Sequence, residues 1–148
     1  MIKSLNVAMI GGGFMGKAHA MAYAAMPMFF WPAPAIPHRK VVVDVNDVLA
    51  EEARQRFGFE EASSNWKDTI ARDDIDVVDI CTPNNVHAEI AIAAAKAGKH
   101  IICEKPLART VEEARAMTKA VKEAGVTNMV AFNYRRTPAV ALANASLT

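Results

Sequence analysis

The residues whose chemistry is easiest to interpret stand in a glycine-rich turn near the N-terminus. Gly11, Gly13 and Gly16 form the pattern Gly-x-Gly-x-x-Gly, with Phe14 and Met15 between the last two. In such a turn the first glycine allows a sharp exit from a strand, the second lets a pyrophosphate approach the backbone, and the third allows close helix packing. Free N–H groups at the start of the helix then favour an anion. We therefore expect all five residues to bind a dinucleotide. A purely structural glycine turn is the alternative.

An acidic residue lies at the end of the next expected strand. A carboxylate at Asp44 can accept hydrogen bonds from the adenosine ribose hydroxyls and repel a 2′-phosphate, which favours NAD over NADP. Its separation from Gly16 exceeds the usual ~20 residues, because an insertion from Pro27 to Arg39 precedes the strand. The alternative is that Asp44 caps the following helix, a role for which Asn46 and Asp47 are better placed.

Length, charge and cysteine content restrict the class of protein. A chain of 148 residues has the length of a single domain. Its net charge of +1 provides no field for a nucleic acid or an anionic membrane surface. Cys81 and Cys103 are too few for a disulfide framework and favour a reducing compartment, as small buried hydrophobes. No apolar run reaches the ~20 residues of a membrane span, and the N-terminus lacks the signature of a signal peptide. We expect a cytoplasmic protein.

Short apolar strands alternate with segments of helical spacing along the chain. Strands are expected at 5–10, 41–45, near Ala62, 77–81, 101–103 and 129–132. Helices are expected at 15–26, where Pro27 would stop the helix, at 49–57, from Asn65, at 86–97, between Thr110 and Gly125, and from Thr137. This alternation predicts an α/β fold: a doubly wound, mostly parallel, Rossmann-like sheet. Residues 1–132 would form the dinucleotide-binding domain, and 133–148 a crossover and the start of a further helix.

Ligands of open α/β sheets bind beyond the carboxyl ends of the strands. The candidate residues that follow strands are Thr82, Pro83 and Asn84, with His87 in the next helix, then Glu104 and Lys105, then Asn133 and Arg135. The other three histidines lie within the first helix (His19), in the insertion (His38) and at the opposite sheet edge (His100). Four histidines without mutual ligand spacing predict no metal site.

Three segments together are distinctive. The glycine turn, the Cys-Thr-Pro-Asn segment 81–84 with His87, and residues 98–108 with their Glu-Lys-Pro sequence closely resemble the N-terminal domain of the Gfo/Idh/MocA oxidoreductase family. The resemblance extends over residues 2–138. Many families share the glycine pattern, whereas the order and spacing of the other two segments are far more specific.

The resemblance implies roles for the residues that follow the strands. Thr82, Pro83 and Asn84 would line the nicotinamide half of the cofactor. Glu104 and Lys105 would lie beside the nicotinamide and the reacting carbon. Lys105 is the expected catalytic residue, because its ammonium can hydrogen-bond the substrate oxygen and stabilise charge that develops during hydride transfer. The alternative for Lys105 is an ion pair with Glu104 or a surface position.

Three further positions have less distinctive roles. The family pattern puts a cofactor-binding histidine at His87, although a histidine in a first helical turn can instead cap or pack. Asn133 and Arg135 match a crossover segment and would contact the nicotinamide ribose or the substrate. The Lys105–Pro106 peptide bond is expected to be cis, as in the family.

The implied activity is that of an NAD(H)-dependent dehydrogenase or reductase acting on a secondary alcohol or ketone of a sugar, polyol or similar small molecule. Family members have a second domain with the acid–base histidine, through which they form homo-oligomers, so residues 1–148 alone are expected to bind the cofactor without turnover. Two alternatives are a stand-alone, non-catalytic nucleotide-binding module, as a sensor or partner subunit, and a methyl-donor-binding domain. The second is disfavoured because Asn84 and Lys105 would have no role in it. The aromatic, proline-rich segment 26–37 could dock a partner, or pack on the domain's own helices or over the cofactor.

Overall fold

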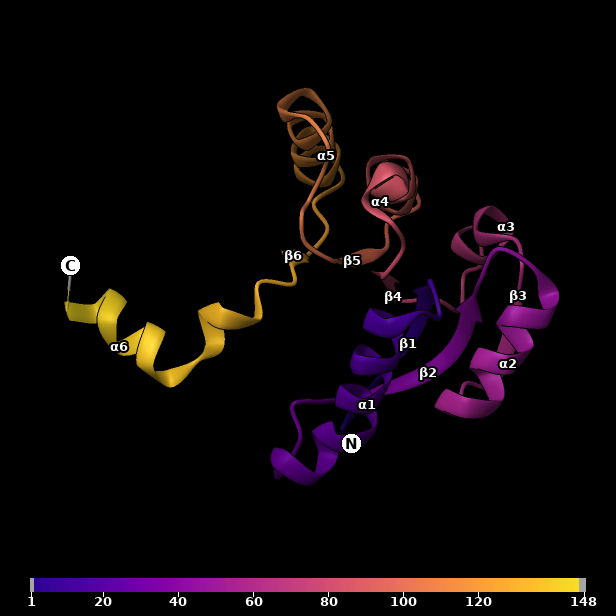
Figure 1. Cartoon of the computed structure of the whole chain (residues 1–148), viewed down its shortest axis with the longest axis horizontal. Helices are drawn as coiled ribbons and strands as arrows, with labels where there is room; N and C mark the ends of the chain where they lie inside the picture. The colour runs from indigo at the N-terminus through magenta and orange to yellow at the C-terminus, as the bar shows by residue number, and fades with distance from the viewer. Residues whose placement is uncertain (1, 147–148) are drawn as a thin grey trace.

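A computed structural model describes residues 2–146, in which six parallel strands form one sheet (Figure 1). The strand order is β3-β2-β1-β4-β5-β6, and every neighbouring pair is parallel. The strands are β1 (Lys3–Ile10), β2 (Ala35–Val43), β3 (Glu61–Ser63), β4 (Val77–Ile80), β5 (His100–Cys103) and β6 (Asn128–Val130). This is the order of a doubly wound dinucleotide-binding sheet, and the predicted fold class is confirmed.

Helices cover both faces of the sheet (Figure 1). One face carries α1 (Phe14–Phe29) and α2 (Asp47–Phe57). The other carries α3 (Trp66–Ile70), α4 (His87–Lys96) and α5 (Val111–Ala124). Two 3₁₀ turns, η1 (Asn84–Val86) and η2 (Asn133–Arg136), and a final helix α6 (Pro138–Ser146) complete the described chain. No helix within residues 2–146 is long and apolar enough to cross a membrane.

The core explains why the strands are apolar throughout. Residues 7–10, 41–43 and 77–80 are all buried, because each central strand is covered on both sides. Ile90 of α4 and Met117 of α5 pack against one face. Ala53 and Phe57 of α2 pack against the other.

The helix ends expected from capping residues are confirmed. Asn46, Asn65 and Thr110 each accept backbone N–H hydrogen bonds at the first turns of α2, α3 and α5. Gly58 and Gly125 end α2 and α5 in the left-handed conformation. By contrast, the residue that precedes α1 is Gly13, which has no side chain to cap the helix, so its first N–H groups have no such partner.

The insertion between α1 and β2 differs from the expectation. Helix α1 continues through Pro27 to Phe29, since a proline in the last turn removes only one late hydrogen bond of the helix. Strand β2 begins at Ala35 and not at Val41, which makes it nine residues long. The pairing with β1 shifts between Val7 and Ala8, where β2 carries an extra residue.

The aromatic residues of this insertion do not pack on the domain's own helices. Phe29 is 80% exposed and Trp31 is 86% exposed. They precede the amino end of β2, whereas the glycine turn follows the carboxyl end of β1. The expectation that they pack internally or cover the cofactor is therefore wrong, because the chain reverses at the opposite edge of the sheet.

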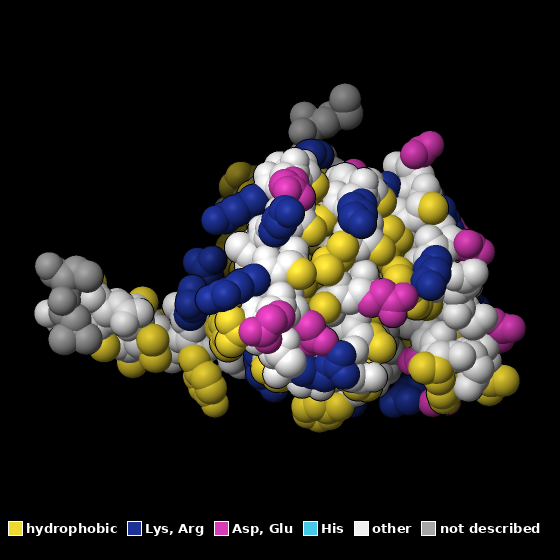
Figure 2. Space-filling view, turned by 90° about the horizontal axis from the view of Figure 1, so that it is seen from above, with side chains coloured by type: hydrophobic (Ala, Val, Ile, Leu, Met, Phe, Trp, Pro, Cys, Tyr) yellow, Lys and Arg dark blue, Asp and Glu magenta, His cyan; other side chains and the backbone are white. Residues whose placement is uncertain are grey.

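Residues 133–146 extend away from the rest of the molecule (Figure 1). Neither η2 nor α6 contains a buried residue. Figure 2 shows hydrophobic side chains on this arm. Leu142 of α6 is 71% exposed.

Candidate cofactor site and a buried polar cluster

The loops that follow the central strands are held together at one edge of the sheet. Gly11 N–H donates to the Val43 carbonyl at 2.8 Å, and Cys81 N–H donates to Ile10 at 2.8 Å. Glu104 N–H donates in the same way to the Ile80 carbonyl at 2.9 Å. The first residues after β1, β4 and β5 are thereby fixed to a neighbouring strand. Because β1 and β4 are where the strand order reverses, this edge is the expected ligand crevice.

The three glycines of the Gly-x-Gly-x-x-Gly pattern differ in what surrounds them. Gly11 has φ of 102°, and a Cβ there would lie 2.7 Å from the Cys81 carbonyl oxygen. A Cβ at Gly16 would overlap the Gly11 carbonyl oxygen. Around Gly13, by contrast, no atom lies within 4 Å of an added Cβ. Gly11 thus allows the turn to lie against the backbone of the loop after β4, and Gly16 allows α1 to pack against the turn. Gly13 leaves open space beside uncapped N–H groups, including those of Phe14 and Met15, where a pyrophosphate fits.

Asp44 lies against this turn. Its Oδ2 accepts from Gly12 N–H at 2.9 Å, and its Oδ1 accepts from Val45 N–H at 2.7 Å. The cap of α2 is Asn46, whose Oδ1 accepts from Leu49 N–H at 2.9 Å. Asp44 is therefore not the cap of α2, and its carboxylate remains at the carboxyl end of β2 beside the turn.

The loop after β4 contains an unpaired polar atom. Thr82 Oγ1 is buried and, among residues 2–146, has no hydrogen-bond partner. Pro83 and Asn84 follow it, and Asn84 begins η1. An unsatisfied buried hydroxyl costs about 1–3 kcal/mol, so a polar ligand group at this edge would recover a hydrogen bond. The residues present therefore fit a dinucleotide.

Glu104 and Lys105 follow β5 with different exposure. The Glu104 side chain is buried, whereas that of Lys105 is 55% exposed. Lys105 N–H donates to Glu104 Oε2 at 3.0 Å, while Lys105 Nζ lies 3.9 Å from the same oxygen. The Lys105–Pro106 peptide bond is cis, as expected. The ammonium is thus loosely paired and accessible from the edge of the sheet.

His87 connects the two loops. Its ring is buried, with Nε2 at 2.9 Å from the Thr82 carbonyl oxygen and Nδ1 at 3.1 Å from the Pro106 carbonyl oxygen. Both ring nitrogens thus face backbone of the protein. The contribution of His87 to this edge is to hold the Thr82 and Pro106 loops together.

Asn133 and Arg135 lie on the projecting arm, beyond β6. Asn133 Oδ1 accepts from Tyr134 N–H at 2.9 Å, and the Arg135 guanidinium lies 5.5 Å from the centre of the Phe132 ring. These contacts are local. The structure does not bring the two residues together with the glycine turn.

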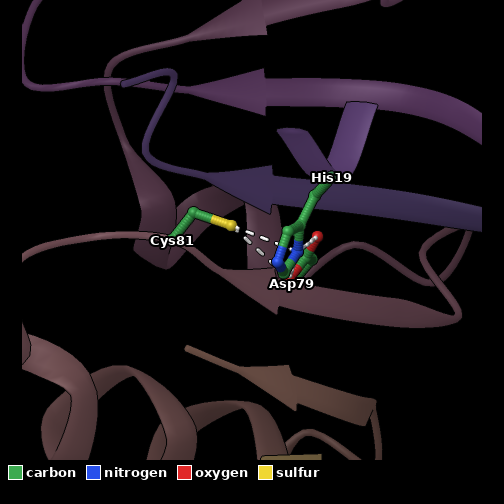
Figure 3. A group of neighbouring side chains, drawn as sticks. All are labelled: His19, Asp79 and Cys81. Atoms are coloured by element: carbon green, nitrogen blue, oxygen red, sulfur yellow. Dashed lines mark hydrogen bonds and ion pairs between the residues drawn. The ribbon is translucent and has the colours of Figure 1, made fainter. Parts of the chain in front are cut away.

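A buried polar cluster lies beneath the crevice and was not found from the sequence (Figure 3). His19 Nδ1 lies 2.9 Å from Asp79 Oδ2, and His19 Nε2 lies 3.1 Å from Glu104 Oε1. Tyr23 Oη donates to Asp79 Oδ2 at 2.7 Å. Two signals in the sequence could have revealed it: His19 and Tyr23 share a helix face, and Asp79 is an ionisable residue inside an apolar strand.

The cluster sets the protonation of its members. The hydrogen bond to Asp79 raises the pKa of His19 above its ordinary value of 6.5, although burial opposes the rise. Burial, with Asp79 nearby, raises the pKa of the Tyr23 hydroxyl and of the Cys81 thiol. Burial also raises the pKa of Cys103 to about 12. These shifts favour the protonated, cationic form of the His19 ring and the neutral form of both thiols.

The close approach of His19, Asp79 and Cys81 also raises the question of a metal ion. Their ligand atoms all lie within 4.8 Å of one another. The Cys81 sulfur lies 3.5 Å from His19 Nδ1 and 3.6 Å from Asp79 Oδ1, which are sulfur hydrogen-bond distances. With the Tyr23 hydroxyl also on Asp79, these contacts are those of a hydrogen-bonded cluster of side chains.

Comparison with known proteins identifies the family. The sequence profile of the Gfo/Idh/MocA group, described as an oxidoreductase family with an NAD-binding Rossmann fold, matches residues 5–132. The chain belongs to this family. The resemblance, the fold and the NAD cofactor expected from the sequence are thereby confirmed at the level of the Gfo/Idh/MocA family.

Individual members of the Gfo/Idh/MocA family match most of the chain. Levoglucosan dehydrogenase of Pseudarthrobacter phenanthrenivorans is 69% identical over 142 residues, which are 96% of this chain and 36% of that protein. Myo-inositol 2-dehydrogenase of Thermotoga maritima is 30% identical over 88% of this chain and 37% of its own length. A solved levoglucosan dehydrogenase in complex with NADH and levoglucosan superposes with a TM-score of 0.95 at 68% identity, over 98% of this chain and 39% of that one. The chain thus spans less than two fifths of the length of these relatives.

Proposed function

We propose that this chain is the NAD(H)-binding domain of a dehydrogenase that transfers a hydride between nicotinamide and a secondary alcohol or ketone of a sugar, with an anhydrosugar such as levoglucosan as the first substrate to test. The observation that carries the proposal is the set of groups at one sheet edge: an open glycine turn, the Asp44 carboxylate and the unpaired Thr82 hydroxyl. The 69% identity to levoglucosan dehydrogenase supports the substrate class.

Each group at this edge has a binding role in the proposal. The N–H groups at the start of α1 bind the pyrophosphate beside Gly13. Asp44 accepts hydrogen bonds from the adenosine ribose and disfavours a 2′-phosphate. Thr82, Pro83 and Asn84 line the nicotinamide half, and His87 holds their loop against the loop of Pro106.

Bound NAD would supply the acceptor for the hydride that leaves the alcohol carbon. Lys105, whose ammonium is exposed at the same edge, donates a hydrogen bond to the substrate oxygen and stabilises charge there during the transfer. The hydroxyl proton leaves to a base outside residues 1–148. In the proposal, Asn133 and Arg135 reach the nicotinamide ribose or the substrate, with residues 133–148 forming the crossover from a domain of residues 1–132.

Two measurements test the proposal. Residues 1–148 should bind NADH, and the increase in NADH fluorescence on binding measures the affinity. They should bind NADPH more weakly. The protein expressed from the complete reading frame should reduce NAD with levoglucosan, whereas residues 1–148 alone should not. Absence of NADH binding would overturn the proposal. Binding by both forms without turnover on levoglucosan, inositols or hexoses would favour the alternative, a non-catalytic nucleotide-binding module.

The assembly and location of the whole protein are part of the same proposal. We propose a homo-oligomer, as the family resemblance implies, which light scattering on the complete protein would test. A reducing, cytoplasmic location is supported by Cys81 and Cys103, both of which are free.

A further inference from the structure

His19 lies between two buried carboxylates that come from different strands. It projects from α1 toward the sheet, and its side chain is 16% exposed (Figure 3). Asp79, within β4, is fully buried, and the Glu104 side chain, just after β5, is 5% exposed. One ring therefore connects the helix that follows the glycine turn to the loop that carries Lys105.

The hydrogen-bond partners of His19 indicate the protonation state of its ring. An ionised carboxylate only accepts, and a neutral imidazole has one N–H, whereas an imidazolium has two. His19 places Nδ1 on Asp79 and Nε2 on Glu104, so both contacts are satisfied when both nitrogens carry a proton. A neutral ring would leave one of the two buried carboxylates facing a nitrogen lone pair, which is energetically costly.

Glu104 transmits this constraint to the next residue. Its Oε1 faces His19, and its Oε2 accepts from Lys105 N–H at 3.0 Å. The two oxygens are thus held from opposite sides, which leaves the carboxylate one orientation. The backbone of Lys105 is therefore connected to the His19 ring through a single carboxylate.

We propose that His19 is a positioning residue: a doubly protonated ring that holds the Glu104 carboxylate, and through it the backbone of Lys105, at the nicotinamide end of the crevice. The contact of Lys105 with cofactor or substrate rests on the proposed function, but the link from His19 to Lys105 does not.

The other groups that face the ring support its charge. Asp79 and Cys81 approach it from β4, Glu104 and Lys105 from the end of β5, and Tyr23 lies on its own helix. Tyr23 donates to Asp79, which leaves Nδ1–H of His19 as a second donor to the same carboxylate. Two carboxylates are then balanced by the ring and by the Lys105 ammonium.

The first test needs no substitution. Nitrogen-15 NMR of residues 1–148 at pH 7 should show two protonated nitrogens in the His19 ring. His100 is the internal reference, because its Nδ1 accepts a hydrogen bond from Thr127 N–H at 3.3 Å. A lone-pair nitrogen in the His19 ring at pH 7 would overturn the proposal whether or not the chain binds NADH.

The second test separates positioning from packing. The amide nitrogen of His19→Asn lies near the former Nδ1 and keeps a donor to Asp79, whereas that of His19→Gln lies near the former Nε2 and keeps a donor to Glu104. The Lys105 amide proton, shifted downfield by its carboxylate partner, should move upfield in H19N and stay in place in H19Q. In the protein expressed from the complete reading frame, turnover should fall about three- to tenfold in H19N and recover in H19Q, while NADH affinity changes less than about threefold in both, as for Lys105→Met.

The outcomes distinguish this proposal from the proposed function. Equal Lys105 amide shifts in wild type and H19N would refute the positioning role. If H19N does not fold, Glu104→Gln provides the comparison, since it should lower the pH at which the His19 ring loses a proton. If the wild type fails to bind NADH while the NMR results hold, only the proposed function fails.

Discussion

The Asp44 carboxylate and the Gly12 backbone N–H are joined by a hydrogen bond of 2.9 Å. The residue expected to select the cofactor is therefore attached to the turn expected to bind its phosphates. A change at Asp44 has two separable effects, on charge and on the shape of the turn. Asparagine separates them, because it keeps an acceptor oxygen for Gly12 and removes the charge.

Asp44→Asn should shift cofactor preference toward NADPH. Without the negative charge, the NADPH-to-NADH affinity ratio should rise about five- to tenfold, since repulsion of the 2′-phosphate is lost. Fluorescence titration with both cofactors measures the ratio. Asp47→Asn, in the first turn of α2, is the matched control and should leave it unchanged. An unchanged ratio in D44N would refute the assignment.

Gly13→Ala and Gly16→Ala should separate binding from folding. A Cβ at Gly13 meets nothing within 4 Å, so G13A should keep its stability within about 0.5 kcal/mol but bind NADH at least about tenfold more weakly, because the methyl group occupies the phosphate space. A Cβ at Gly16 overlaps the Gly11 carbonyl, so G16A should lose about 1–3 kcal/mol of unfolding free energy. Urea denaturation and NADH titration of both variants test this. Normal NADH binding by G13A would contradict the phosphate site.

The contribution of His19 to stability should depend on pH. Because the folded-state pKa of His19 is raised above 6.5, its contribution is fully present below pH 6.5 and is lost as the pH rises through the folded value. The wild type should exceed His19→Gln by about 1–3 kcal/mol at pH 6, with the difference shrinking toward pH 9. Urea denaturation of both proteins at several pH values gives the difference. A difference in unfolding free energy that grows with pH would contradict a raised pKa of His19 in the folded state.

Lys105→Met should affect chemistry much more than binding. In the protein expressed from the complete reading frame, turnover should fall about 10²–10³-fold, because a donor to the developing charge is lost. NADH affinity should change less than about threefold. Lys96→Met, at the exposed end of α4, is the control. Steady-state kinetics with NAD and levoglucosan measure this effect. Turnover by Lys105→Met equal to that of the wild type would exclude Lys105 from the reaction.

Zinc should not stabilise the chain. His19, Tyr23 and Cys81 already hydrogen-bond to Asp79, and these contacts would have to break before a metal ion could bind. Equimolar zinc should leave the thermal unfolding midpoint of wild type and Cys81→Ser equally unchanged. A rise in the wild type that disappears in C81S would mean that the three residues bind metal.

The fold was predictable because local signals and topology agree. Apolar strands, capping residues such as Asn46 and Thr110, and the glycine turn all indicated the same alternating α/β pattern. The start of β2 was not predictable, since residues 35–40 have no apolar run and become a strand only by pairing with Lys3–Val7. The end of α1 was not predictable either. The helix continues beyond Pro27 because its last turn tolerates one missing hydrogen bond.

The site was predictable only where residues follow strands. That rule identified Asp44, Thr82 and Glu104, which the structure brings to one edge. The partners of these residues from other elements were not predictable. The pairing of His19 with Asp79 joins positions 60 residues apart, and only the packing of α1 on β4 brings them together.

The strand order has a consequence for how the chain folds during synthesis. The central strand β1 pairs with β2 early, but its other edge pairs with β4, where Val7 opposes Val77. Closing a contact across so many residues is slow, as in other topologies rich in non-local contacts. Until residues 77–80 leave the ribosome, the apolar edge of β1 has no partner and is exposed to other chains. Nascent chains in which residues 77–80 have not yet left the ribosome should therefore aggregate or bind chaperones, and chains in which these residues have emerged should be released from them.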